Sequence, residues 1–291
     1  MKLLLAGFFA FVTLTGLSQS QSLKLWYKQP SGNTWENALP IGNGRLGAMV
    51  YGNVANETIQ LNEHTVWTGS PNRNDNPLIL DSLAFMRQLI WDGKQKEAER
   101  MANRVILSKK SHGQMFEPVG ELHLVFDGHE NYTDYYRDLD IEKAVAKTSY
   151  KVGGVSYTRE VLASIPDRVI LIHLTASKPQ SLSFTAYYTT PFRNVDRKAN
   201  PGNQLTISGT TMDHEGVKGM IKYKGIAQIK TAGGAYSSTD TSITVKNASE
   251  ATIYISIASN FNNYHDLDGN ENERADGYLN KAIANSFALI W

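Results

Sequence analysis

The sequence contains no cysteine at all. This absence excludes a disulfide framework, a thiolate metal site and catalysis by a cysteine nucleophile. An excess of charge is lacking too, because 29 Lys and Arg oppose 28 Asp and Glu, for a net charge of +1. Composition therefore gives no electrostatic case for binding nucleic acid or an anionic membrane surface.

Long apolar runs are also missing, and the one short run lies at the N-terminus. Residues 1–20 combine Lys2, an apolar stretch over residues 3–12, and the small residues Ser18 and Ser20. This pattern is typical of a secretory signal peptide. The rival interpretation, a membrane anchor, needs about 20 apolar residues, more than this stretch supplies. We expect a secreted protein, located in a bacterial periplasm or outside the cell.

Many short strand patterns dominate the mature chain. Alternating or β-branched segments recur from residue 23 to about residue 257, and the segments between them are rich in Gly, Ser, Asn and Asp. Because no helices alternate with these strands, the pattern predicts a mainly β fold, a large β-sandwich over residues 21–262. Gly153-Gly154 predicts a tight hairpin within it.

Two helical segments interrupt the strands. Residues 77–90 and 93–107 carry helical patterns, and Ala98, Met101, Ala102 and Val105 fall on one face of the second. Asp92-Gly93 predicts the turn between them. We therefore expect an inserted αα-hairpin that caps one open end of the sandwich.

The C-terminal stretch has a different pattern. Residues 271–291 predict a helix whose apolar stripe consists of Leu279, Ile283, Phe287 and Ile290. An exposed helix ending in large apolar residues needs a surface to pack on. We interpret residues 263–291 as the start of linker helices in a truncated chain.

Residues 35–69 hold the densest group of candidate functional side chains. Residues 42–47, Gly-Asn-Gly-Arg-Leu-Gly, match the dinucleotide-binding pattern, but a β-like segment follows where that site needs a helix. The seven histidines show no metal-ligand spacing, and no G-x-S-x-G elbow is present. These observations disfavour nucleotide, metal and α/β-hydrolase sites, and no cofactor is expected.

Carboxylates and tryptophans remain as candidates for sugar chemistry. Glycoside hydrolysis needs one carboxyl as acid and a second group to activate water or attack. Each tryptophan offers a flat apolar face for a sugar ring, although core or interface packing is the commoner use. The carboxylates near aromatic or glycine-rich segments are Glu36, Glu57, Glu63, Glu117 and Glu121, and the tryptophans are Trp26, Trp35 and Trp67.

Several of these segments, in order, resemble the N-terminal domain of glycoside hydrolase family 95, the inverting 1,2-α-L-fucosidases. The matching segments are residues 25–27 with Pro30, 35–52, 59–69 with Pro71, 116–122, 136–140 and 155–164. The resemblance implies a β-sandwich joined by helices to an (α/α)₆ barrel. It also implies that the barrel carries the catalytic residues and is the intramolecular partner of this domain.

No segment of this chain matches that barrel, so we assign no catalytic residue and expect the chain alone to be inactive. The candidates for a substrate cleft or a domain-facing edge are Arg45, Asn62, Glu63, His64 and Trp67. The alternative function is a free-standing carbohydrate-binding module, which needs an exposed aromatic platform. The substrate sugar, fucose or L-galactose, stays open.

Overall fold

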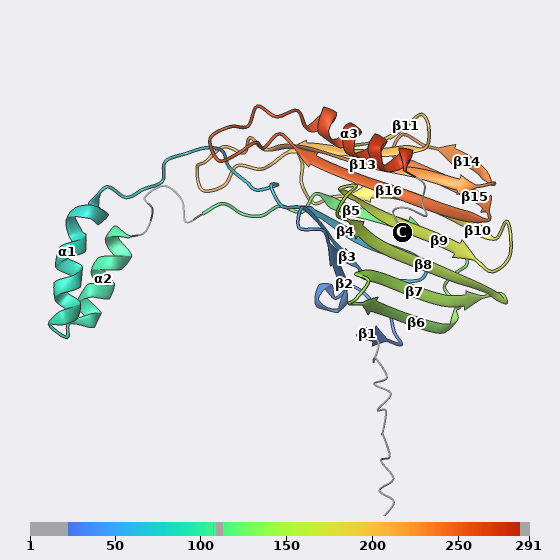
Figure 1. Ribbon diagram of the computed structural model, residues 1–291, viewed down its shortest axis with the longest axis horizontal. Coiled ribbons are helices and arrows are strands. Elements are labelled where there is room, and N and C mark those ends of the chain that lie inside the picture. The colour runs from blue at the N-terminus through green and yellow to red at the C-terminus, as the bar shows by residue number, and fades with distance from the viewer. Residues whose placement is uncertain (1–22, 107, 109–112, 286–291) are drawn as a thin grey trace, which may run out of the picture.

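The computed structural model describes residues 23–106, 108 and 113–285, so the signal peptide predicted at residues 1–20 lies outside the described residues. Two antiparallel sheets lie face to face (Figure 1), one with strand order β1-β6-β7-β8-β9-β16-β13-β12-β11 and the other with β14-β15-β10-β5-β4-β3-β2. The predicted β-sandwich is confirmed. None of the helices in the described part of the chain has the length and apolar character to cross a membrane.

The strands are short and lie in an order far from their sequence order. The nine-stranded sheet contains β1 (Lys24–Tyr27), β6 (Thr133–Asp140), β7 (Val145–Val152), β8 (Val155–Ser164), β9 (Val169–Ala176), β16 (Glu250–Ser259), β13 (Lys222–Ala232), β12 (Gln204–Thr210) and β11 (Val195–Asn200). The seven-stranded sheet contains β14 (Ala235–Ser238), β15 (Ser242–Ala248), β10 (Leu182–Thr189), β5 (Gly120–Val125), β4 (Asn56–Glu63), β3 (Leu46–Val50) and β2 (Leu39–Gly42). The helical elements are η1 (Trp35–Asn37), α1 (Leu78–Trp91), α2 (Gln95–Val105) and α3 (Glu271–Ala284).

The main core lies between the two sheets. Strand β10 alternates buried and half-buried residues, as a strand with one face on a core should. Strand β16 instead is buried at nearly every position. Its second face is covered by α3, which packs Ala275, Leu279 and Ala282 against the outer side of the nine-stranded sheet. The sandwich therefore has a third layer over its central strands.

This third layer corrects the prediction of an open apolar helix. Leu279 is buried on the sheet, and Ile283 packs against the same cluster. The helix ends at Ala284 rather than at residue 291, because Asn285 is extended and donates its side-chain amide to Asp167 at 2.7 Å. Residues 286–291, which include the predicted Phe287 and Ile290, lie outside the described part.

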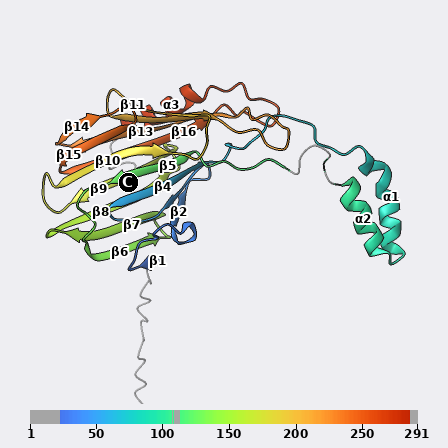
Figure 2. The ribbon, with the colours of Figure 1, turned by 180° about the vertical axis from the view of Figure 1, so that it is seen from behind.

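The predicted αα-hairpin is present, but it does not cap the sandwich. Figures 1 and 2 both show α1 and α2 standing away from the two sheets at the end of two connecting segments. The helices bury Met86 and Leu89 of α1 and Ala98 and Val105 of α2. Because that small interface uses only part of their apolar surface, large side chains such as Trp91 stay exposed.

The position of the hairpin predicts that it is dispensable for folding of the sandwich. Thr68 donates its backbone N–H to the Met115 carbonyl at 2.8 Å, so the two connecting segments lie side by side where they leave the sandwich. Replacing residues 73–112 with a short Gly-Ser linker should change the unfolding free energy of the sandwich by less than about 1 kcal/mol. Urea unfolding followed by circular dichroism measures this. A loss above about 2 kcal/mol would show that the hairpin supports the sandwich after all.

Candidate functional site

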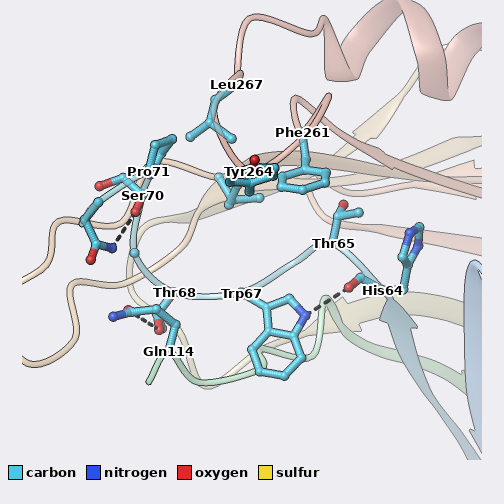
Figure 3. A pocket seen from close by; sticks show the side chains of 13 residues that line it. His64, Thr65, Trp67, Thr68, Ser70, Pro71, Gln114, Phe261, Tyr264 and Leu267 are labelled. Atoms are coloured by element: carbon cyan, nitrogen blue, oxygen red, sulfur yellow. Dashed lines mark hydrogen bonds between the residues drawn. The ribbon is translucent and has the colours of Figure 1, made fainter. Parts of the chain in front are cut away.

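A pocket of about 540 Å³ lies along residues 64–72, the segment that leads from β4 toward the hairpin, and Figure 3 shows its lining from close by. Two loops far apart in sequence form most of it, one following β4 and the other following β16. Its lining residues are His64, Thr65, Trp67, Thr68, Gly69, Ser70, Pro71, Asn72, Gln114, Ile221, Phe261, Tyr264 and Leu267.

The first wall is fixed at its base by Glu63, the last residue of β4. Its buried carboxylate accepts hydrogen bonds from the backbone N–H of Thr65 at 2.8 Å and from the Thr65 hydroxyl, and it lies 3.2 Å from Nδ1 of His64. The Thr65 hydroxyl also contacts that of Ser259 at the end of β16. Glu63 therefore sets the turn that presents the loop, and its oxygens already have partners.

Trp67 lies on this first wall in a fixed orientation. Its indole N–H donates to the His64 carbonyl at 2.9 Å, and its ring packs edge to face on Phe116 with ring centres 5.3 Å apart. The side chain nonetheless stays 44% exposed. Because the indole N–H is occupied, the part of Trp67 that is left open is apolar ring surface.

Gly69 allows the wall to close around Gln114. Its φ of +86° lies in the left-handed region, and a Cβ there would come within 2.5 Å of the Gln114 side-chain oxygen. That oxygen accepts the Thr68 hydroxyl at 2.9 Å. Glycine suits this position, because another residue would be strained at this φ and would displace the Gln114 side chain.

The second wall, residues 261–267, is held by two buried or half-buried polar side chains. Asn260 donates to the carbonyls of Met220 and Leu267 at 3.2 and 2.9 Å, and Arg274 of α3 donates to the Phe261 carbonyl at 2.9 Å. Tyr264 projects from this loop and is 74% exposed. Both walls are therefore braced by hydrogen bonds to the sandwich or to α3.

Arg45 lies behind the pocket and faces α3 rather than the pocket. Its guanidinium lies 3.5 Å from Glu63, donates to the carbonyls of Ile257 and Arg168 at 2.6 and 2.9 Å, and lies over the ring of Tyr278. Burial lowers the pKa of Arg45, and the charge of Glu63 acts in the opposite direction. Arg45 therefore ties β3, the two sheets and α3 together.

The structure brings some of the five predicted site residues together and separates others. Arg45, Glu63 and His64 are in contact, and His64 and Trp67 line the pocket. Asn62 alternates with the buried Glu63 along β4, so it lies on the opposite, outer face of the seven-stranded sheet. Residues 64–68, which follow β4, form a turn with a single bridge from Trp67 to Phe116.

The candidate carboxylates form no facing pair at the pocket. Glu57 is paired with Arg159 at 3.2 Å, and Glu117 accepts the backbone N–H of Met212 at 2.8 Å. Burial raises the pKa of Glu117. Glu121 lies beside His123 at 3.4 Å on β5, and Glu36 is exposed in η1. In the described part of the chain, no group of three potential ligand side chains is arranged to hold a metal ion.

The glycine pattern at residues 42–47 lies between β2 and β3. The Asn43 side chain accepts the backbone N–H groups of Arg45 and Leu46 at 3.1 and 2.7 Å, which closes a hairpin between the two strands. No helix follows that would offer its N-terminus to a pyrophosphate. The β-like segment that the sequence predicts after these glycines is confirmed as β3.

Sequence reasoning missed the second wall of the pocket. Tyr264 stands among polar residues in the segment 262–269, and a lone aromatic side chain in such a loop is the signal that was available. Phe261 and Leu267 gave no signal, because their role depends on a contact with residues about 200 positions earlier. Gln114 lies outside the sequence segments that were selected as candidates.

Comparison with known proteins gives consistent results. A family model described as "Glycosyl hydrolase family 65, N-terminal domain" matches residues 25–264. "Alpha-L-fucosidase 2" of Arabidopsis thaliana is 35% identical over 270 residues, which are 85% of this chain and 31% of that protein. "Probable alpha-fucosidase A" of Aspergillus oryzae is 27% identical over 284 residues, 93% of this chain and 37% of that protein. The chain thus spans about a third of the length of these curated relatives.

A solved structure shares the fold. The "Putative kojibiose phosphorylase from human microbiome" matches with a TM-score of 0.55 and 10% identity, over 94% of this chain and 37% of that one. The expected resemblance to the N-terminal domain of α-fucosidases is confirmed by the named relatives. Because the family model covers most of the sequence, the chain belongs to the family of glycosyl hydrolase family 65 N-terminal domains.

Proposed function

We propose that this chain is the N-terminal β-sandwich of a secreted family 95 glycoside hydrolase that removes terminal α-1,2-linked fucose from glycans by inversion. The observation that carries the proposal is its similarity over 85% of its length to a protein named α-L-fucosidase. The ordered segments that resemble family 95 supply the linkage and the stereochemistry. Residues 1–20 direct secretion in this proposal. The mass of the exported protein, measured by mass spectrometry, should then correspond to a chain without these residues.

The chain contributes structure rather than the acid and base of hydrolysis. Hydrolysis by inversion needs two carboxyl groups about 6.5–9.5 Å apart, with a water between them and the sugar. The described residues that line the pocket include no carboxylate. Glu57 and Glu63 are buried and already paired with arginines. We therefore assign the chemistry to an (α/α)₆ barrel that follows this domain.

The segment 35–69 is proposed as the edge that faces this barrel. Its turn at Glu63 contacts Ser259 through Thr65, and Arg45 contacts α3. α3 is the last described helix, so the edge and the C-terminal part of the described chain belong to one connected region. Braced loops and exposed rings at such a place suit a surface that another domain covers.

An activity measurement tests the proposal. Purified residues 21–291 should release no fucose from 2'-fucosyllactose, because the described residues that line the pocket include no carboxyl pair. A longer product of the same gene that includes the barrel should release it, with β-L-fucose as the first product seen by NMR. An L-galactose-capped analogue, run in parallel, separates the two candidate sugars. Fucose release by residues 21–291, or initial α-L-fucose from the longer product, would contradict the proposal.

A further inference from the structure

We propose that the pocket between the loops after β4 and β16 binds an uncharged pyranose unit of a glycan. This inference deepens the proposed function and rests on it only for the identity of the sugar. The cavity of about 540 Å³ falls within the range of about 300–1,000 Å³ that is usual for small-ligand sites. It is large enough for more than one sugar ring.

Aromatic rings on the two facing walls carry the inference; Trp67 and Tyr264 are exposed and Phe261 is half-buried. Trp67 contributes from the first wall, and Tyr264 and Phe261 contribute from the second, as Figure 3 shows. The C–H face of a pyranose is apolar, and burying it on an aromatic ring is favourable. Because the indole N–H of Trp67 is already bonded to His64, its ring cannot rotate freely and stays in place for stacking.

The polar groups of the lining suit hydroxyl groups. Ser70, Asn72 and Gln114 place hydroxyl and amide groups around the rings, whereas the Thr68 hydroxyl is already bonded to Gln114 and to the backbone N–H of Met115. Each of these groups both donates and accepts hydrogen bonds, as a sugar hydroxyl does. An apolar floor with a few polar groups that fix orientation is the usual composition of a ligand pocket.

The absence of charged Asp, Glu, Lys and Arg side chains from the described lining favours neutral sugars over charged ones. The described residues that line the pocket include no Asp, Glu, Lys or Arg. A sialic acid, uronic acid or sulfated sugar would bring a negative charge into the pocket without a lysine or arginine to pair with it, and burying such a charge is costly. The lining therefore fits a neutral sugar.

The pocket is also formed before any ligand arrives. Glu63 fixes the first wall, Asn260 and Arg274 fix the second, and the contact between Thr65 and Ser259 joins the two. A site that needs no ordering on binding loses less free energy when the ligand is immobilised.

Titration of the chain with neutral and charged oligosaccharides tests the inference. Calorimetry or ligand-observed NMR with 2'-fucosyllactose and lactose should show saturable binding with a dissociation constant of roughly 1 mM. The charged comparison sugar is 3'-sialyllactose, which should bind more weakly. Trp67→Ala and Tyr264→Ala should each weaken binding of the neutral sugar about tenfold. Trp91→Ala, which removes an exposed tryptophan from α1, is the matched control and should leave binding unchanged.

Circular dichroism of each variant keeps the test decisive. Tyr264 is largely exposed, so Tyr264→Ala should fold even where Trp67→Ala does not. No saturation of the intact chain at tens of millimolar, equal binding by Tyr264→Ala, or a preference for the sialylated sugar would overturn the inference. So would a change in self-association on loss of Trp67 without any sugar binding, which assigns the pocket to protein contact. If the chain binds the sugar but the longer product has no fucosidase activity, only the proposed function is contradicted. If the longer product is active but the chain binds no sugar, only the proposed sugar site is contradicted.

Discussion

Replacing Arg159 with methionine is expected to lower the free energy of unfolding by about 3–5 kcal/mol. Arg159 lies on β8 and is only 3% exposed. Its guanidinium donates to Glu57 at 3.2 Å, to the Asn53 carbonyl at 2.6 Å and to the Tyr150 hydroxyl at 2.7 Å. Methionine keeps much of the side-chain volume but leaves a carboxylate, a carbonyl and a hydroxyl without this partner in the interior.

The loss should depend on pH, and its sign follows from Glu57. Burial raises the pKa of Glu57 above its ordinary value of 4.5, and the charge of Arg159 is the strongest influence in the opposite direction. Without Arg159 the pKa of Glu57 should rise further. A carboxyl group with a raised pKa binds its proton more tightly in the folded state. The contribution of Glu57 to the free energy of unfolding is therefore greatest below pH 4.5 and falls as the pH rises toward the folded-state pKa.

Urea unfolding of the intact chain and of Arg159→Met at an acidic and a neutral pH measures both effects. Lys147→Met on the neighbouring strand β7 is the control, because its ion pair with Glu160 at 3.5 Å is partly exposed. The control should change stability by less than about 0.5 kcal/mol. A loss below about 1 kcal/mol for Arg159→Met, or a loss that shrinks as the pH rises, would contradict the prediction.

The interior strands could be predicted from the sequence, whereas three of the edge or near-edge strands could not. Strand β2 at one edge of its sheet contains Pro40, and the edge strands β11 and β14 contain no buried residue. An edge strand has one side without a partner and often carries polar residues or proline that prevent unwanted pairing. In β2 the proline and the glycine hide the strand although Leu39 and Ile41 are buried, whereas β11 and β14 have no buried residue to reveal a core-facing side.

The surface on which α3 packs could not be predicted from the sequence either, because it depends on the order of the strands in the sheet. The apolar stripe of α3 indicated that a partner surface exists, but not that the surface is the outer face of β9, β13 and β16. The continuous burial of β16 is the matching half of that contact. Neither half determines the other until the strand order is known, and that order places residues 253 and 172 side by side.

The candidate site divides along similar lines. His64 and Trp67 were found because unusual residue types cluster in a short segment. The sequence could not distinguish Glu63, which is buried as an anchor, from a catalytic acid, since that distinction depends on the contacts with Arg45 and Thr65. Tyr264 reaches the same pocket from the other end of the chain, which only the fold reveals.

Replacing Glu63 with alanine is expected to destabilise the sandwich by about 2–4 kcal/mol and to weaken sugar binding at the pocket. Its carboxylate bonds the backbone and hydroxyl of Thr65 and pairs with Arg45. Without it, the partly buried guanidinium of Arg45 loses its counter-charge and the turn that carries Trp67 loses its anchor. The loss should be smaller than for Arg159→Met, because the Arg45 side chain is more exposed than that of Arg159.

A graded series separates the anchor from the charge. Glu63→Gln keeps an oxygen that accepts the Thr65 N–H and should cost about 1–2 kcal/mol while leaving the turn in place. Glu36→Ala removes an exposed carboxylate from the same segment and should change stability by less than about 0.5 kcal/mol. Urea unfolding gives the stabilities, and the binding of 2'-fucosyllactose at a temperature where each variant is fully folded reports the pocket. If folded Glu63→Ala bound the sugar as tightly as the intact chain, the predicted effect on binding would be wrong. Glu63 would then stabilise the sandwich without shaping the pocket.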